Sequence, residues 1–126
     1  MRGLTISAHG GLDKIEYRTD LLKPEPKRGE IRVRVRAAAL NHLDLFVVGG
    51  LPGVTIQPPW VLGADATGVI DAIGDLSGVA DNQLKVGDSV IINGGVSDLT
   101  CEYCQAGEHS LCVRYKMLGE HLPGTL

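Results

Sequence analysis

The segment "EIRVRVRAAAL", residues 30–40, carries the clearest secondary-structure signal of the chain. Its aliphatic residues Ile31, Val33 and Val35 alternate with three arginines. Because successive side chains of a strand point to opposite faces, this period of two predicts a strand with one aliphatic and one arginine face. Such arginines more often form a solvated face than an anion site, so we expect the arginine face to lie in solvent.

Other aliphatic runs predict further strands on either side of this one. Residues 1–6 and 13–18 read as two short strands joined through the Gly10-Gly11 turn, and residues 60–74 and 87–94 as strands bent at glycines. Helix signals are weak: a short helix can start at Asn41 and stop at Gly49-Gly50, and residues 101–109 can hold one turn. The pattern predicts a mainly β barrel or sandwich.

The composition limits the class of protein. With 126 residues, the chain has the length of one ordinary domain. Its net charge of −3 gives no general attraction to nucleic acid or an anionic membrane, and we expect neither as a partner. We expect no signal peptide and no membrane span. Three cysteines, an odd number, do not suit a disulfide framework, so a reducing cytoplasm is the simplest location.

All three cysteines lie in "VSDLTCEYCQAGEHSLC", residues 96–112. Cys101 and Cys104 are three residues apart, so both thiols can bind one ion from a single turn, and Cys112 can close the site. The alternatives are free thiols or a redox pair at Cys101 and Cys104. Because the loop has little apolar content to order itself, we predict a structural zinc-binding lobe at about residues 94–116.

The fourth zinc ligand must then supply oxygen or nitrogen. Asp98 precedes Cys101 by the same three residues that separate Cys101 from Cys104, and a carboxylate is an acceptable zinc ligand. His109 and Glu108 are rivals within the loop, and an incomplete site also stays open. We favour Asp98.

At this point the chain resembles the medium-chain dehydrogenase/reductase family, which includes zinc-type alcohol dehydrogenases and quinone oxidoreductases. The lobe is similar to the family's Cys-x2-Cys-x2-Cys-x7-Cys pattern, with Asp98 in the first position. The run "GADATGVIDAIGDLS" resembles Gly-His-Glu-x2-Gly-x5-Gly, with Gly63, Gly68 and Gly74 in place. "AALNHLDLFVVGG" and "KVGDSVIINGG" also look like family segments, and together the matches span most of residues 1–126.

The resemblance implies a fold and a context for the chain. It implies a mainly β, GroES-like, partly open β-barrel with short helices and a zinc-binding lobe. Residues 1–126 would be the N-terminal catalytic domain of an oxidoreductase whose Rossmann domain, which binds NAD or NADP, is absent from this sequence. We expect a small-molecule carbonyl or alcohol substrate, a homo-oligomer at full length, and no activity from this domain alone.

The chain departs from the family pattern at the reacting centre. Asn41 stands at the position of the catalytic cysteine ligand, Ala64 at that of the histidine, and Asp65 at that of the following glutamate. Alanine cannot bind zinc and an amide binds it poorly, so we predict that the catalytic zinc is lost.

The remaining polar residues of this region are candidates for the chemistry. Asn41, Asp44 and Asp65 are the candidate catalytic residues, and His42 is a candidate contact to the cofactor pyrophosphate. Asn41 suits a helix N-cap equally well. We expect carbonyl, enone or quinone reduction by hydride from the nicotinamide. The alternatives are a zinc alcohol dehydrogenase with unusual ligands and a non-enzymatic, zinc-stabilised binding module.

Overall fold

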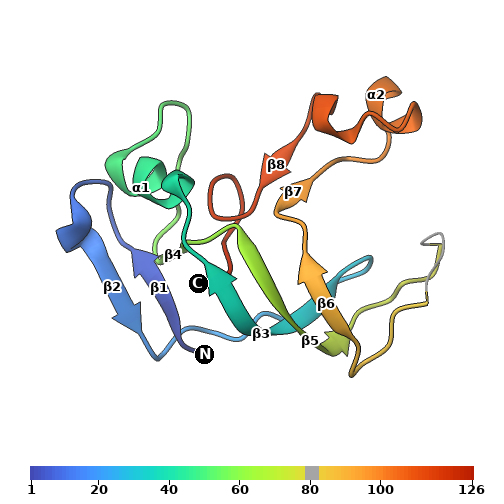
Figure 1. Cartoon of the computed structure of the whole chain (residues 1–126), viewed down its shortest axis with the longest axis horizontal. Coiled ribbons are helices and arrows are strands. Elements are labelled where there is room, and N and C mark those ends of the chain that lie inside the picture. Colours follow the sequence, from blue (N-terminus) through green and yellow to red (C-terminus); the bar gives the residue numbers. More distant parts are fainter. Residues whose placement is uncertain (79–82) are drawn as a thin grey trace.

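The computed structural model describes residues 1–78 and 83–126, which form three small antiparallel sheets and a few short helices (Figure 1). The first sheet has the order β2-β1-β4, the second β3-β5-β6, and the third consists of β7 and β8. The mainly β prediction is therefore confirmed. The sheets of the described residues stay open and do not close into a barrel.

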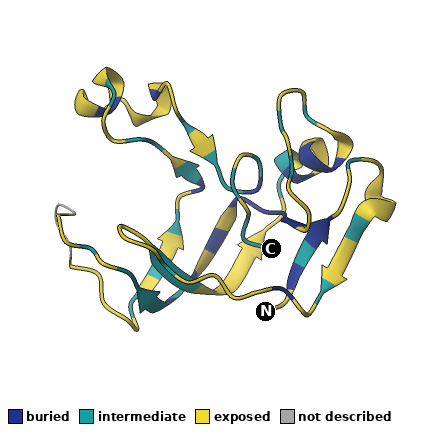
Figure 2. Cartoon of the chain, turned by 180° about the vertical axis from the view of Figure 1, so that it is seen from behind, coloured by how far each residue is buried: buried dark blue, intermediate teal, exposed yellow. Residues whose placement is uncertain are grey.

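The hydrophobic core lies between the first sheet and helix α1. Strand β1 (Gly3–Ile6) pairs with β2 (Ile15–Arg18) on one side and with β4 (Trp60–Val61) on the other. The short 3₁₀ helix η1 (Leu12–Lys14) takes the start of the predicted strand 13–18. Buried residues are dark blue in Figure 2, and a hydrophobic cluster of them consists of Ile6, Val47, Val48, Trp60 and Leu62.

The second sheet confirms the strand predicted from residues 30–40. Strand β3 (Ile31–Ala39) pairs with β5 (Asp65–Ile73), which pairs with β6 (Ser89–Ile92). The prediction of a solvated arginine face is wrong for Arg32, whose side chain is only 14% exposed and donates to Asp71 at 2.7 Å. Register shifts after Arg32 and after Val35 interrupt the alternation, and Val35 is 39% exposed.

Two glycines, Gly63 and Gly68, let neighbouring segments of the backbone approach closely. A Cβ at Gly68, in β5, would overlap the carbonyl oxygen of Arg34 on the neighbouring strand. Gly63 lies between β4 and β5 with φ of +97°, a left-handed conformation that favours glycine. A Cβ at this position would overlap Leu126. The final residues run alongside β4, where the Leu126 N–H donates to the Leu62 carbonyl at 2.8 Å.

Helix α1 (His42–Gly49) has the bounds that the sequence predicts. Asn41 is its N-cap residue in extended conformation, and Gly50 caps its C-terminus with φ of +95°. Within residues 1–78 and 83–126, no helix has the length and apolar character needed to cross a bilayer.

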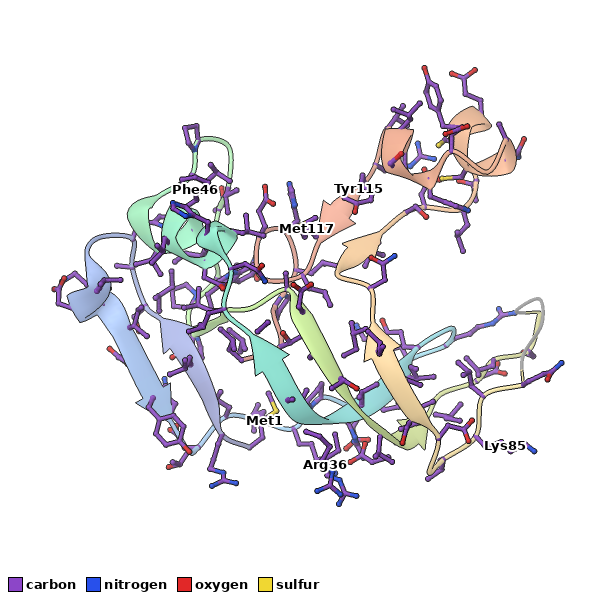
Figure 3. The ribbon with its side chains drawn as sticks, in the orientation of Figure 1. Met1, Arg36, Phe46, Lys85, Tyr115 and Met117 are labelled. Atoms are coloured by element: carbon purple, nitrogen blue, oxygen red, sulfur yellow. The ribbon has the colours of Figure 1, made fainter. Side chains whose placement is uncertain are left out.

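Residues 95–117 form a lobe that projects from the two larger sheets (Figure 1). Its base is the short ribbon of β7 (Gly95–Val96) and β8 (Lys116–Met117). Tyr115 lies at this base (Figure 3), and its hydroxyl lies against Gly95, where a larger residue would clash. Helix α2 (Glu102–Gln105) is the predicted single turn, and the 3₁₀ helix η2 (His109–Leu111) follows it.

Candidate metal site and reacting centre

The lobe brings four potential ligands together. One ligand atom each from Asp98, Cys101, Cys104 and Cys112 lies within 4.8 Å of the others. The sulfur atoms of Cys101 and Cys104 are 3.5 Å apart. Zinc–sulfur bonds of about 2.3 Å in a tetrahedral site place ligand atoms roughly 4 Å apart, so the spacing fits a zinc ion. Among the described residues this is the one such group of three or more.

The local backbone explains this convergence. Cys101 is the N-cap of α2 and Cys104 lies one turn further on, so their side chains meet on the same side. Leu99 has a left-handed φ of 60°, which turns the chain just before the helix. As a result, Asp98 Oδ1 accepts hydrogen bonds from the N–H groups of Thr100 at 2.7 Å and Cys101 at 2.9 Å.

These hydrogen bonds prepare Asp98 as a ligand. The N–H of Cys101, followed by that of Thr100, lowers the pKa of Asp98 far below its usual range, so the carboxylate is ionised. The second oxygen, Oδ2, is buried and accepts no hydrogen bond. Arg114 Nη2 lies 2.6 Å from it as an ion pair without hydrogen-bond alignment. A buried carboxylate oxygen without a donor is suited to a cation.

The thiols differ in how readily they ionise. The N–H of Cys104 is the main cause that lowers the pKa of Cys101, whereas burial raises the pKa of Cys104 to about 11. Cys112 is buried as well, and its sulfur accepts the N–H of Asp98 at 3.4 Å. Because zinc binds thiolates, zinc binding at neutral pH must release the proton of Cys104.

The rival fourth ligands lie outside this cluster. The Nδ1 of His109 is 3.1 Å from the Ser97 hydroxyl, with which it shares a hydrogen bond. Glu108 is exposed at the start of η2. Of the alternatives left open by the sequence, the geometry favours Asp98 as the partner of the three thiols.

The candidate catalytic residues lie close together where β3 ends and β5 begins. The Asn41 Nδ2 donates to Asp65 Oδ2 at 2.8 Å. Since a carboxylate only accepts, this contact fixes the NH2 group of Asn41 on the Asp65 side. Its second N–H has no hydrogen-bond partner among residues 1–78 and 83–126. The neighbouring Ala64 is buried at 6% exposure and offers no ligand atom.

Asp44 and His42 take different positions from this pair. Asp44 is buried, and its two oxygens accept the N–H groups of Asn41 at 2.8 Å and Gly63 at 2.9 Å. It therefore attaches the start of α1 to the turn before β5. His42 is exposed, with its ring 4.8 Å from that of Phe46. Its predicted cofactor contact stays a prediction.

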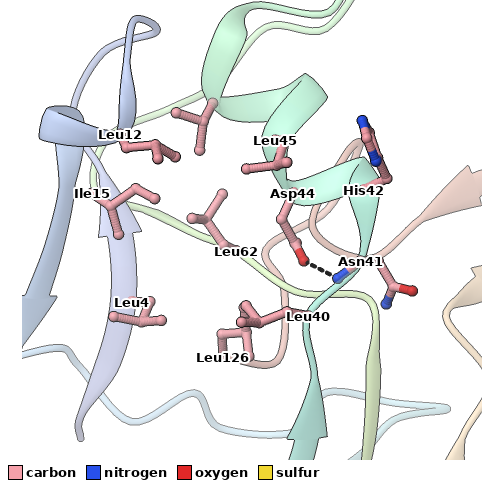
Figure 4. A pocket seen from close by; sticks show the side chains of 11 residues that line it. Leu4, Leu12, Ile15, Leu40, Asn41, His42, Asp44, Leu45, Leu62 and Leu126 are labelled. Carbon is pink, nitrogen blue, oxygen red and sulfur yellow. Dashed lines mark hydrogen bonds between the residues drawn. The ribbon is translucent and has the colours of Figure 1, made fainter.

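Two hollows flank this region. One, of about 390 Å³, lies between β1, η1 and α1 and is lined mainly by aliphatic side chains (Figure 4). The amide group of Asn41 points away from these side chains in Figure 4. The other, of about 380 Å³, lies on β3, β5 and β6 and includes Asp65 with alanine and isoleucine side chains. Asn41 lines the first hollow and Asp65 the second, so the contact between these two side chains lies where the hollows adjoin.

Sequence reasoning missed Arg114. The only available signal was a basic residue two positions after Cys112, and such a residue is too common to indicate a contact. The turn at Leu99, which aims the Asp98 carboxylate, gave no signal either.

Comparison with known proteins finds a matching family and several relatives of this chain. A family model for the alcohol dehydrogenase GroES-like domain matches residues 27–126. The quinone oxidoreductase of Lama guanicoe is 28% identical over 120 residues, which is 95% of this chain and 34% of that protein. A crystal structure of an NAD-dependent alcohol dehydrogenase superposes with a TM-score of 0.88 at 48% identity, over 99% of this chain and 35% of that one.

A second solved structure is that of a metal-bound relative. The cobalt- and zinc-bound thermostable alcohol dehydrogenase from Pyrobaculum aerophilum superposes with a TM-score of 0.83 at 25% identity, over 98% of this chain and 36% of that one. The chain spans about a third of the length of these relatives.

Proposed function

The chain belongs to the alcohol dehydrogenase GroES-like domain family, within the medium-chain dehydrogenases and reductases, and on this premise we propose that it is the catalytic domain of an NAD(P)-dependent oxidoreductase. The substrate of the whole protein is a small-molecule carbonyl, enone or quinone. The names of its relatives, a quinone oxidoreductase and an NAD-dependent alcohol dehydrogenase, support this class.

The metal ion of this domain is a structural zinc in the lobe, held by Asp98, Cys101, Cys104 and Cys112. Three sulfur donors and one carboxylate oxygen within 4.8 Å of one another support this assignment. Because four protein ligands complete a tetrahedral site, no position remains for substrate, and the ion orders the lobe.

The reacting centre works without a zinc ion of its own. This part of the proposal rests on the contact between the Asn41 Nδ2 and Asp65 Oδ2, which engages the carboxylate with an amide where a metal would need it. Ala64 cannot contribute a ligand, and an amide is a poor substitute for a thiolate.

The contact of Asn41 with Asp65 supports a division of roles in carbonyl reduction. A nicotinamide held by the cofactor domain of the whole protein would supply the hydride. The free N–H of Asn41 donates to the carbonyl oxygen, where negative charge grows during the transfer, while Asp65 holds the amide in orientation. Asn41 keeps its proton, so water protonates the product oxygen. Asp44 fixes the backbone of Asn41 and thereby its place beside Asp65.

The setting of the whole protein completes the proposal. Thiolates that bind zinc persist in a reducing compartment, which supports the cytoplasm. Exposed aliphatic side chains on the lobe, Leu111 at 57% and Val113 at 63%, support a homo-oligomer at full length.

The first test is the zinc content of protein purified without added metal, together with a titration of its thiols. We expect one zinc per chain and three protected thiols. Two zinc ions per chain would overturn the metal-free reacting centre, and no zinc with three reactive thiols would overturn the lobe site.

The second test concerns the donor role and uses the native gene product. Asn41→Ala should lower kcat/KM about 100-fold, because one hydrogen-bond donor to the reacting oxygen is removed. The zinc content should not change. Full activity of this variant with carbonyl and quinone substrates would refute the role of Asn41.

A further inference from the structure

We propose that Arg114 competes with the metal ion for Asp98 Oδ2, so that the lobe binds zinc less tightly than its four ligands alone would. The inference rests on the proposed zinc site, and it adds a residue that controls how readily the site exchanges its metal.

The two oxygens of the Asp98 carboxylate have different contacts. Its Oδ1 is already held by two backbone N–H groups, at 2.7 and 2.9 Å. Oδ2 is the oxygen left for a metal, and Arg114 Nη2 lies 2.6 Å from that same oxygen. The cation of the chain and the metal ion therefore seek one ligand atom.

The positive charge of Arg114 also opposes metal binding. An ion bound to Oδ2 and the three thiolates would carry two positive charges next to the Arg114 guanidinium. Repulsion between these cations opposes metal binding while Arg114 stays in place. The Arg114 side chain is 62% exposed, and its Nη2 also donates to the Thr100 hydroxyl at 3.1 Å. It can therefore withdraw into solvent when the metal binds.

The opposite role, a supporting partner that orients the ligand, predicts the opposite result. Residues that orient metal ligands strengthen binding, and their loss typically weakens it about 10- to 100-fold. Asp98 does not need this support, because its orientation is set through Oδ1 and the turn at Leu99. The contact to Oδ2 therefore points to competition.

The experiment compares Arg114→Gln with Lys116→Gln. Lys116 is an exposed lysine of β8 with no ion pair among the described residues, so its substitution removes the same charge nearby without touching Asp98. Zinc dissociation constants are measured by competition with a chromophoric chelator at one pH. Titration with cobalt(II), whose visible absorption reports its coordination, gives a second readout that needs no enzyme activity.

We expect Arg114→Gln to bind zinc about five- to tenfold more tightly than the unsubstituted protein, with Lys116→Gln within about twofold of it. Cobalt should show the same order and one unchanged spectrum, because the four ligands are the same. Equal or weaker binding by Arg114→Gln would overturn the competition while leaving the zinc site intact. Absence of zinc and cobalt binding in all three proteins would overturn the site and this inference together.

Discussion

The two carboxylate oxygens of Asp98 have different roles. Oδ1 holds the turn by accepting the N–H groups of Thr100 and Cys101, and Oδ2 faces the thiols and Arg114. This division allows the two tasks to be tested one at a time, because an asparagine keeps an oxygen for the turn and places an amide NH2 group where the metal would bind.

We therefore expect Asp98→Asn to weaken zinc binding at least about tenfold while the lobe in its zinc-bound form stays folded. Asp98→Cys should retain one zinc per chain, since it restores four ligands. Both can be followed by chelator competition. Unchanged affinity in Asp98→Asn would show that another group, such as His109, completes the site.

Asp71 makes a pH-dependent contribution to the free energy of unfolding. The hydrogen bond from Arg32 is the main cause that lowers the pKa of Asp71, and Lys23 contributes from 3.2 Å. The unfolded pKa is about 3.9, so the folded value lies below it. A lowered folded pKa adds stability above the unfolded pKa and loses it as the pH falls towards the folded pKa.

Asp71→Asn should consequently be less stable than the unsubstituted protein at pH 7, and its stability should fall less steeply below about pH 5. Urea unfolding midpoints at a series of pH values measure this. Arg32→Gln should flatten the acid side in the same way, because it removes the partner of the same ion pair. Parallel pH curves for all three proteins would contradict the assignment.

At the scale of elements, the close contact of β3 and β5 depends on the missing side chain of Gly68. A Cβ there would overlap the Arg34 carbonyl, which cannot move without breaking the ladder between these strands. Gly49 is a matched control, because it lies at the end of α1 with no atom within 4 Å of a Cβ.

Gly68→Ala should lower the free energy of unfolding by about 1–3 kcal/mol. Gly49→Ala should leave it unchanged or raise it by up to about 1 kcal/mol, because alanine restricts the unfolded chain and favours helix. Chemical denaturation of both variants distinguishes the two effects. Similar losses in both would mean that packing at Gly68 is looser than the structure indicates.

Elements set by local signals were predictable from sequence. Asn41 and Gly50 bound α1, and the period of two identified β3, because both depend only on neighbouring residues. The bulges of β3 depend on its pairing with β5, and they brought Arg32 into a half-buried ion pair that the alternation did not indicate. The extent of sheet pairing is likewise decided by contacts between distant segments.

The candidate sites divide in the same manner. Spacing indicated the three thiols and favoured Asp98 over His109 and Glu108, since all of these residues lie within one short loop. The contact of Asn41 with Asp65 joins residues 24 positions apart, and that of Arg114 with Asp98 depends on the turn at Leu99. Neither could be read from a one-dimensional pattern.

For the whole molecule, the lobe and the sheets differ in what holds them. The core lies between β1, β4 and α1, whereas the buried side chains of the lobe loop, residues 97–114, are Cys104 and Cys112. We therefore predict that the lobe is ordered by the proposed zinc ion, whereas the sheets are ordered by apolar burial.

A strong chelator should then disorder residues 98–113 while leaving the sheets folded. Amide NMR spectra would show loss of dispersed signals from the lobe and unchanged signals from β1, β3 and β5, and added zinc should reverse the change. Loss of the signals from all strands together would show that the lobe supports the whole fold.

The antiparallel pairing of β7 with β8 has an evolutionary consequence. Val96 lies opposite Lys116, so the chain leaves for the lobe and returns from it at neighbouring points. The segment with the four candidate ligands thus lies within one hairpin, and a tight turn after Val96 would reconnect the ribbon. Changes in the length of this segment would leave the pairing of the scaffold strands in place.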